Sequence, residues 1–326
     1  MRNKNIQFSF LVIMMLASMV ACKKEEYTIP DPVSLLTNDC IKRTIGPSIV
    51  SLPLEFAYAM AIPKSSGKLV SAQVEASIAG ASGTYLEHRS FYTNSGGVDV
   101  PVLVGSPSLT VDKTTKMTYS IDTNAATLRY NYVIPEGARG QSVSFTFSVT
   151  SSDGKTASYK MGPYTISKMS INRNLAVSNG VNAYISIEDM AVYNAAAAAA
   201  TPGKIDLVYL FRAAPTTFTH ALVSPAADAA YLPGVTLPAG LNRSTKLRKV
   251  FNLQDRNLAN LQFGIYVDDV DLINVDMVDM PNYAIGLRAE AGVWVETADK
   301  KYRAYIFVNS INAAGSAVIS MLRLTL

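Results

Sequence analysis

The chain has 326 residues, with 29 basic and 25 acidic side chains and a formal net charge of +4. This near balance of charge excludes the strong basic bias that nucleic-acid-binding proteins usually show. The length predicts about two domains, each large enough to bury a hydrophobic core of its own.

Residues 1–21 have the composition of a signal peptide. Two basic residues precede an apolar run at 8–21, which is shorter than the roughly 20 residues that a membrane-spanning helix needs. The run ends in small residues directly before a cysteine, so residues 16–22 resemble a bacterial lipoprotein signal. The resemblance implies cleavage after Ala21 and a diacylglyceryl thioether on Cys22, which would anchor the chain to a membrane. The alternative is an ordinary secretory signal followed by a chance cysteine.

A charged segment follows the cysteine. Lys24, Glu25 and Glu26 resemble the surface-export signal of Bacteroidetes lipoproteins, in which a lysine and two acidic residues come just after the lipidated cysteine. This resemblance implies an outer-membrane protein exposed at the cell surface. The alternatives are a merely solvated segment and a periplasmic location. Charges, prolines and the lack of periodicity predict that residues 22–38 form a tether.

Residues 39–168 are predicted to form an immunoglobulin-like β-sandwich. Apolar residues alternate with others over 52–62, 70–78, 128–134 and 143–149, which is the period of a half-buried strand. Asp153-Gly154 then marks a hairpin, because glycine tolerates the positive φ of a tight turn. If Cys22 carries lipid, Cys40 has no partner, and we expect it to be a small buried residue outside any disulfide.

Residues 169–326 are predicted to form a second, mainly β domain with at least one covering helix. The run at 302–308 is apolar on both faces, which is typical of a central strand. A segment at 189–200 ends in six alanines and predicts a helix, since alanine has the highest helix propensity. Basic residues between Arg243 and Lys249 are interpreted as part of a solvated strand or loop.

The sequence shows no signature of catalysis. His88 and His220 are its two histidines, no G-x-S-x-G motif occurs, and zinc-binding spacings are absent. We therefore expect no enzyme activity, no cofactor and no metal. Acidic residues cluster from Asp268 to Asp271, where calcium binding is an alternative to a solvated acidic connection.

Two stretches are candidates for ligand binding. One stretch combines the aromatic rings of Tyr85 and Tyr92 with the guanidinium of Arg89. Such a combination can bind sugars through contacts with the ring faces and through hydrogen bonds. The same residues could form an ordinary strand edge. Trp294, the only tryptophan, could offer a sugar platform, although an alternating strand favours a core position for it.

The chain resembles the two-domain surface lipoproteins of Bacteroidetes, of the domain-of-unknown-function type. The resemblance is carried by residues 16–22, by Lys24 to Glu26, and more loosely by the phrases SDGKTASYKMGPYTIS, KIDLVYLF and HALVSPAADA. It implies a loose kinship with accessory lipoproteins of starch-utilisation-like systems. Two hypotheses follow: a glycan-binding or accessory module of an outer-membrane uptake system, or a structural or adhesive lipoprotein that contacts other proteins. Neither involves nucleic acid.

Overall fold

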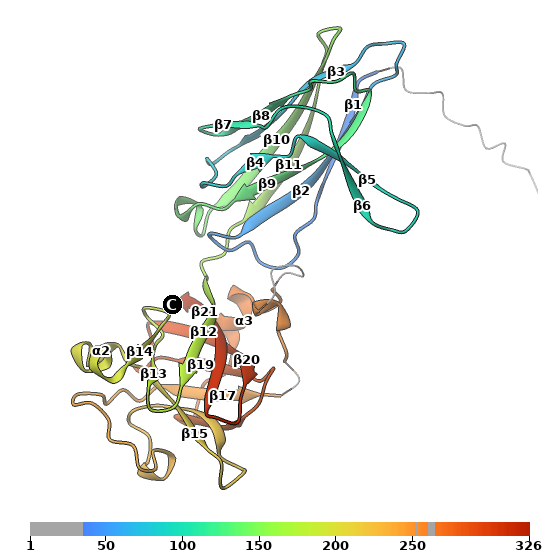
Figure 1. Cartoon of the computed structure of the whole chain (residues 1–326). Coiled ribbons are helices and arrows are strands. Elements are labelled where there is room, and N and C mark those ends of the chain that lie inside the picture. Colours follow the sequence, from blue (N-terminus) through green and yellow to red (C-terminus); the bar gives the residue numbers. More distant parts are fainter. Residues whose placement is uncertain (1–34, 252, 260–264) are drawn as a thin grey trace, which may run out of the picture. The chain divides into compact units, whose positions relative to one another are not determined.

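The structure is a computed structural model that describes residues 35–251, 253–259 and 265–326. The predicted signal peptide, Cys22, the export residues Lys24, Glu25 and Glu26, and most of the tether lie outside the described residues. The described chain is mainly β and builds two antiparallel sandwiches, which confirms the predicted fold class (Figure 1). Among the described residues, no helix is both long and apolar enough to cross a membrane.

The first sandwich is built from two antiparallel sheets. One sheet has the order β1 (Thr37–Lys42), β2 (Pro53–Ala61), β9 (Ala125–Val133) and β4 (Tyr85–Leu86). The other has the order β11 (Thr156–Thr165), β10 (Ser142–Ser151), β3 (Leu69–Ala76), β8 (Thr114–Thr118) and β7 (Leu109–Val111). A separate hairpin pairs β5 (Arg89–Thr93) with β6 (Asp99–Leu103), and a 3-10 turn, η1, spans Glu136–Ala138.

Aromatic residues from both sheets fill the core of the first sandwich. Phe56 on β2 and Tyr130 on β9 face Phe145 on β10, and the ring centroids of Phe56 and Phe145 are 4.9 Å apart. Every second residue of these strands is buried, as the alternating pattern predicts. The Asp153-Gly154 turn joins β10 to β11, with Gly154 at a φ of +81°, so the predicted hairpin is confirmed.

The second sandwich follows with two further five-stranded sheets. The first has the order β12 (Ser170–Ser178), β21 (Ser316–Thr325), β20 (Tyr302–Ile311), β19 (Gly292–Glu296) and β17 (Lys246–Val250). The second has the order β14 (Ala191–Asn194), β13 (Asn182–Ser186), β15 (Leu207–Arg212), β16 (Thr219–Val223) and β18 (Tyr283–Leu287). Its helical elements are α2 (Ala195–Ala200), η2 (Pro202–Lys204), η3 (Ala229–Tyr231), η4 (Arg256–Leu258) and α3 (Asp269–Asn274).

Strand β20 lies at the centre of its sheet and is buried on both faces, as its apolar sequence predicts. Ala304, Ile306 and Val308 belong to the core between the two sheets. Tyr305 and Phe307 point the other way, into a cluster that includes Leu272 of α3. The second sandwich therefore has an inner core and an additional layer over one outer face.

The predicted helix at 189–200 is wrong in its first half. Residues 191–194 form strand β14, in which Val192 pairs with Ile185 and Tyr193 with Tyr184 of β13. Branched and aromatic side chains favour a strand here, and this preference outweighs the helical context. The helix α2 starts only at the alanines, where the Asn194 side chain accepts a hydrogen bond from the Ala197 N–H at 2.9 Å. Ala198 of α2 is buried, so the expected covering helix is present but short.

Candidate functional site

The sequence-predicted binding residues of the first sandwich do not form one platform. Arg89 and Tyr92 are three residues apart on β5, so their side chains lie on opposite faces of that strand. The Arg89 guanidinium is also engaged, because it lies 2.6 Å from a Glu87 carboxylate oxygen. Tyr85 is 45% exposed on β4, and Tyr92 is 56% exposed beside a shallow hollow that neither Tyr85 nor Arg89 lines. The structure therefore does not bring Tyr85, Arg89 and Tyr92 together on one face, and a binding role for any of them stays a prediction.

Trp294 is a core residue. Its side chain is only 6% exposed, and its ring centroid lies 4.7 Å from that of Tyr305 on the neighbouring strand. The α3 layer contributes to the same apolar cluster. A buried indole offers no face to a sugar, so the tentative assignment of Trp294 to binding is wrong and its core interpretation is confirmed.

Asp268 and Asp271 cap the N-terminus of helix α3. The Asp268 side chain accepts hydrogen bonds from the Val270 and Asp271 N–H groups, and the Asp271 carboxylate accepts one from the Asp268 N–H at 3.0 Å. This reciprocal arrangement is a capping box, which satisfies N–H groups at the start of a helix. Within the described ranges, no group of three or more His, Cys, Asp or Glu residues is placed to hold a metal ion.

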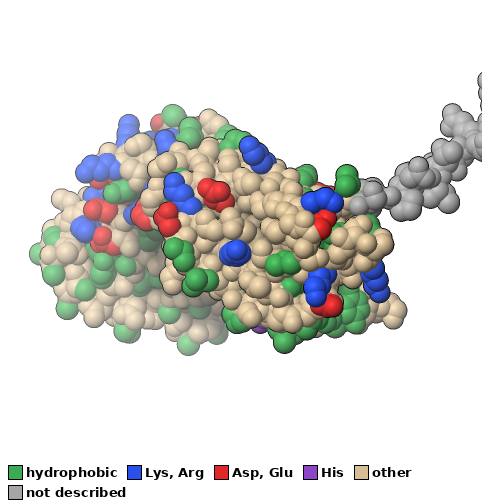
Figure 2. Space-filling view, turned by 90° about the horizontal axis from the view of Figure 1, so that it is seen from above, with side chains coloured by type: hydrophobic (Ala, Val, Ile, Leu, Met, Phe, Trp, Pro, Cys, Tyr) green, Lys and Arg blue, Asp and Glu red, His purple; other side chains and the backbone are tan. Residues whose placement is uncertain are grey.

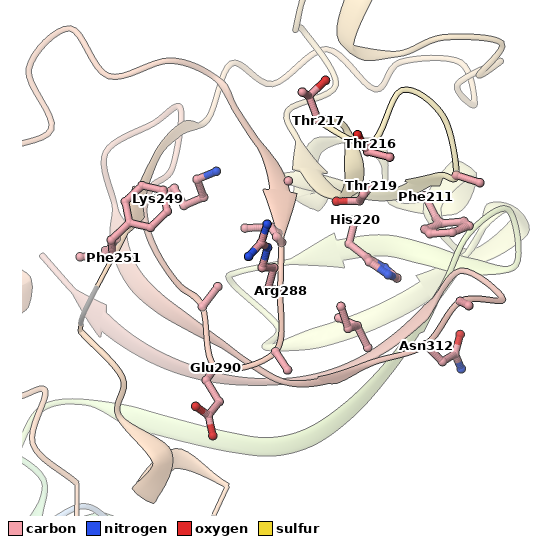
Figure 3. Close-up of a pocket in the computed structure, with 18 of the residues that line it drawn as sticks. Phe211, Thr216, Thr217, Thr219, His220, Lys249, Phe251, Arg288, Glu290 and Asn312 are labelled. Carbon is pink, nitrogen blue, oxygen red and sulfur yellow. The ribbon is translucent and has the colours of Figure 1, made fainter.

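A large hollow lies at one end of the second sandwich, where connections between strands meet the end of β17 (Figure 3). The cavity has a volume of about 1220 Å³. It is bounded by the β15–β16 turn, the end of β17, the β18–β19 connection and the β20–β21 turn, and we call it the end pocket. Its lining residues with polar or aromatic side chains are Phe211, Thr216, Thr217, Thr219, His220, Lys249, Phe251, Gln254, Arg288, Glu290 and Asn312.

His220 forms part of the inner wall of the end pocket. Its Nδ1 lies 2.6 Å from the Tyr209 hydroxyl, and its ring centroid is 4.7 Å from that of Phe211. Burial lowers the pKa of His220, so the imidazole is neutral at pH 7. The Tyr209 contact fixes the ring orientation, and a neutral imidazole can then act as a hydrogen-bonding group toward the cavity.

Two basic side chains reach the same cavity from different strands. Lys249, at the end of β17, donates a hydrogen bond from Nζ to the Ile285 carbonyl at 2.7 Å. Arg288 follows β18, is exposed, and is drawn near the centre of the cavity in Figure 3. Glu290 is the acidic residue of the lining, and it forms an ion pair with Arg256 at 2.9 Å. The charge left facing the cavity is therefore positive.

Two phenyl rings stand at the end pocket. Phe251 is 76% exposed, with the Lys249 ammonium 5.0 Å from its ring centroid. Phe211 is half-buried and is held from behind by the β20–β21 turn, where Gly315 has a φ of +83°. Both rings thus belong to the wall of a solvent-accessible cavity, which also carries the hydroxyls of Thr216, Thr217 and Thr219. Such a wall combines apolar ring faces with hydrogen-bonding groups.

Sequence reasoning missed the end pocket, although two of its residues carried a signal. His220 is one of only two histidines, and Lys249 closes the basic stretch that was interpreted as solvated. Arg288 and Phe251 gave no signal in the sequence, because both lie in connections between strands. The periodicity of apolar residues predicts strands, but it does not predict which connections lie close together in the fold.

Charge is mixed on one face of the molecule. On the face drawn in Figure 2, the described Lys and Arg side chains lie among Asp and Glu side chains. This interspersion matches the near balance of charge in the sequence.

Comparison with known proteins identifies two matching family models and several similar solved structures. A model described as a domain of unknown function, DUF4466, matches residues 33–166, and one described as a domain of unknown function, DUF8576, matches residues 167–326. A DUF4466 family protein from Parabacteroides merdae, solved by crystallography at 2.00 Å resolution, is 47% identical to the chain. The match covers 90% of this chain and 100% of that chain, with a TM-score of 0.85.

Two structures of BcpA, the major pilin subunit of Bacillus cereus, are similar at a much lower level. They are 10% and 7% identical to the chain, with TM-scores of 0.27 and 0.29. The matches cover 47% and 89% of this chain and 46% and 67% of those chains, respectively, and this similarity carries no argument. No curated protein matches the chain.

Proposed function

The chain belongs to the DUF4466 family, and on that premise we propose that it is a non-catalytic binding protein that holds a carbohydrate in the end pocket. The observation that carries the proposal is the wall of the end pocket, where the rings of Phe211 and Phe251 stand beside threonine hydroxyls and the imidazole of His220. Sugars present C–H faces that pack on rings and hydroxyls that need hydrogen-bonding partners.

The size of the end pocket suits an oligosaccharide. Pockets for small molecules usually have volumes of roughly 300–1,000 Å³. The end pocket, at about 1220 Å³, is larger than that range and has room for more than one sugar ring. It is built from connections at the end of a sandwich, which is where such folds commonly carry their binding residues.

Binding is tested by affinity electrophoresis of the detergent-solubilised full chain through gels that contain plant, algal or host polysaccharides. We expect at least one polysaccharide to retard the chain, and Phe251→Ala to abolish most of the retardation. Tyr92→Ala is the matched control, since Tyr92 is also an exposed aromatic residue but lies on the first sandwich. A failure of every polysaccharide, or loss with Tyr92→Ala and not with Phe251→Ala, would contradict the proposal.

We propose further that the chain is displayed on an outer membrane by lipid on Cys22, with Lys24, Glu25 and Glu26 directing it to the cell surface. Mass spectrometry of the membrane form should find a diacylglyceryl group on Cys22, and Cys22→Ser should release the chain from the membrane. Proteinase treatment of intact cells should digest it. Protection from the protease would place it on the periplasmic side and remove the surface assignment.

A protein-binding role is the second candidate, and one observation favours it. Apolar side chains are exposed on the edge strand β7, at Leu109 and Val111, and on the β5–β6 hairpin, at Val98, Val102 and Leu103. An exposed apolar patch is typical of an interaction surface. Cross-linking on cells, followed by recovery of an outer-membrane partner that Leu109→Asp prevents, would support this role over carbohydrate binding.

A further inference from the structure

The charge of the end pocket identifies the class of carbohydrate. Resting on the proposed binding function, we infer that the ligand carries an anionic group, a carboxylate or a sulfate ester, and that Arg288 and Lys249 hold that group. The inference goes beyond the rings and hydroxyls of the pocket wall, because those features would serve a neutral sugar equally well.

Arg288 has unused hydrogen-bonding capacity. Within residues 35–251, 253–259 and 265–326, no hydrogen-bond or ion-pair partner is found for its guanidinium, although the group lines the end pocket. By contrast, the guanidinium of Arg243 contacts two carboxylates, and that of Arg303 contacts Glu296. A planar guanidinium presents donors in a fork that matches the two oxygens of a carboxylate or a sulfate.

Lys249 brings a second positive charge to the same cavity. Its ammonium uses one donor on the Ile285 carbonyl, which leaves donors for a ligand. Burial lowers the pKa of Lys249, and the nearby charge of Arg288 lowers it further. Two like charges that face one cavity destabilise each other, and an anion between them would remove that cost.

The acidic residue of the lining does not neutralise this pair. Glu290 forms an ion pair at 2.9 Å with Arg256, which does not line the cavity, so the charge of Glu290 is already balanced. His220 adds no charge, because burial keeps the imidazole neutral. The cavity therefore offers two cations and neutral donors, which is the complement of an acidic sugar.

A carbohydrate fits this cavity better than an acidic peptide. The anionic group would lie at Arg288 and Lys249, while the rings of Phe211 and Phe251 would contact the C–H faces of the sugar. The hydroxyls of Thr217 and Thr219 supply neutral partners for sugar hydroxyls. An extended acidic peptide carries carboxylates along its whole length and would need basic residues spread along the cavity to pair with them. Among the described residues that line the cavity, the basic ones are only Lys249 and Arg288.

The test is isothermal titration of the detergent-solubilised full chain with paired oligosaccharides. Oligogalacturonate and oligoalginate are each paired with their carboxyl-reduced neutral forms, and chondroitin sulfate is paired with chondroitin that has been both desulfated and carboxyl-reduced, so that it is neutral too. Polyglutamate of similar length is the peptide probe. We expect an acidic member of at least one pair to bind at least about 10-fold more tightly than its neutral partner, because charge-assisted hydrogen bonds exceed neutral ones in strength.

Variants assign the effect to the two cations. Arg288→Ala and Lys249→Met should each weaken binding of the acidic sugar by about 10-fold or more, and Arg288→Lys should recover part of the loss. Arg212→Ala is the matched control, because Arg212 is an exposed arginine at the end of β15 whose side chain does not line the cavity. Circular dichroism of each variant checks that the sandwiches stay folded.

The outcomes separate the two proposals. Equal binding of acidic and neutral partners would overturn the anionic inference and leave carbohydrate binding standing. Binding of polyglutamate at the strength of the acidic sugars would overturn the carbohydrate assignment. If no probe binds and the polysaccharide gels show no retardation, both proposals fail.

Discussion

Arg243 and Asp206 form a buried ion pair in the second sandwich, with Arg243 Nε 2.8 Å from Asp206 Oδ1. The Asp206 side chain is almost fully buried, and its Oδ2 accepts a hydrogen bond from the Ile187 N–H at 2.9 Å. Arg243 also lies 3.0 Å from Asp299, so one guanidinium serves two carboxylates. The side chains of Asp206, Arg243 and Asp299, with the backbone N–H of Ile187, thus link four segments that are distant in the sequence.

The pKa of Asp206 predicts a specific dependence of stability on pH. Burial raises this pKa from 3.8 to about 6, against the opposing effects of the Ile187 N–H and of Arg243. Between these two values the folded state keeps a proton that the unfolded state releases. The contribution of Asp206 to the free energy of unfolding is therefore complete below about pH 4 and is lost as the pH rises to 6, by up to about 3 kcal/mol.

Urea denaturation of the chain and of Asp206→Asn, at pH 4, 5, 6 and 7, measures this dependence. Other titrating groups cancel in the difference between the two proteins. We expect the stability of the chain relative to Asp206→Asn to fall across this range and to level off above pH 6. A difference that stays constant, or that grows with pH, would show that folding does not raise the pKa of Asp206.

Removal of Arg243 should be costly at neutral pH. Arg243→Ala leaves Asp206 buried without its cation, and loss of one partner of a buried pair costs about 3–5 kcal/mol. Arg256→Ala is the matched control, since Arg256 is an exposed arginine paired with Glu290, and exposed pairs contribute about 0–1 kcal/mol. Calorimetric melting at pH 7 compares them. Similar losses for the two variants would contradict the burial argument.

The first sandwich could be predicted because its strands have one buried face. Strand β2 buries every second residue, namely Leu54, Phe56, Tyr58 and Met60. These core residues therefore recur in the sequence with a period of two, which makes the strand predictable. The same logic correctly placed the 302–308 segment at the centre of its sheet. It failed at β14, where a strand of four residues is too short to show a period before the alanines begin.

The end pocket could not be predicted for a different reason. Thr217, Arg288 and Asn312 come from three separate connections and Lys249 from the end of β17, and each is unremarkable in its own segment. Only the pairing order of the two sheets brings these connections to one end of the sandwich. The converse holds for Arg89 and Tyr92, which are close in the chain but lie on opposite faces of β5.

Cys40 should resist thiol reagents in the folded chain. The side chain is 4% exposed on β1, and burial, with a smaller effect of the Asp39 charge, raises the pKa of the thiol to about 12. The thiolate is the reactive form, so the native protein holds almost none of it at pH 8. Mass spectrometry after iodoacetamide treatment should find Cys40 unmodified in buffer and modified in guanidinium chloride. Rapid modification in buffer would mean that β1 opens from its sheet.

Gly315 connects the fold to the end pocket through Phe211. A Cβ at position 315 would lie 2.8 Å from Phe211 Cδ1, and the backbone φ there is +83°. Gly315→Ala should therefore destabilise the chain by about 1–2 kcal/mol and displace the Phe211 ring from the cavity wall. If that ring contacts the ligand, the variant should also bind the retarding polysaccharide more weakly.

Gly180→Ala separates backbone strain from the contact with Phe211. Gly180 also has a positive φ, +73°, but a Cβ there would meet nothing within 4 Å. Both variants should lose stability through strain, and only Gly315→Ala should lose binding in affinity electrophoresis. If both variants bind as well as the unchanged chain, Phe211 does not contribute to binding. If both lose binding to the same extent, the cause is a general loosening of the second sandwich. The pair thus tests whether the turn between β20 and β21 shapes the pocket through a single aromatic ring.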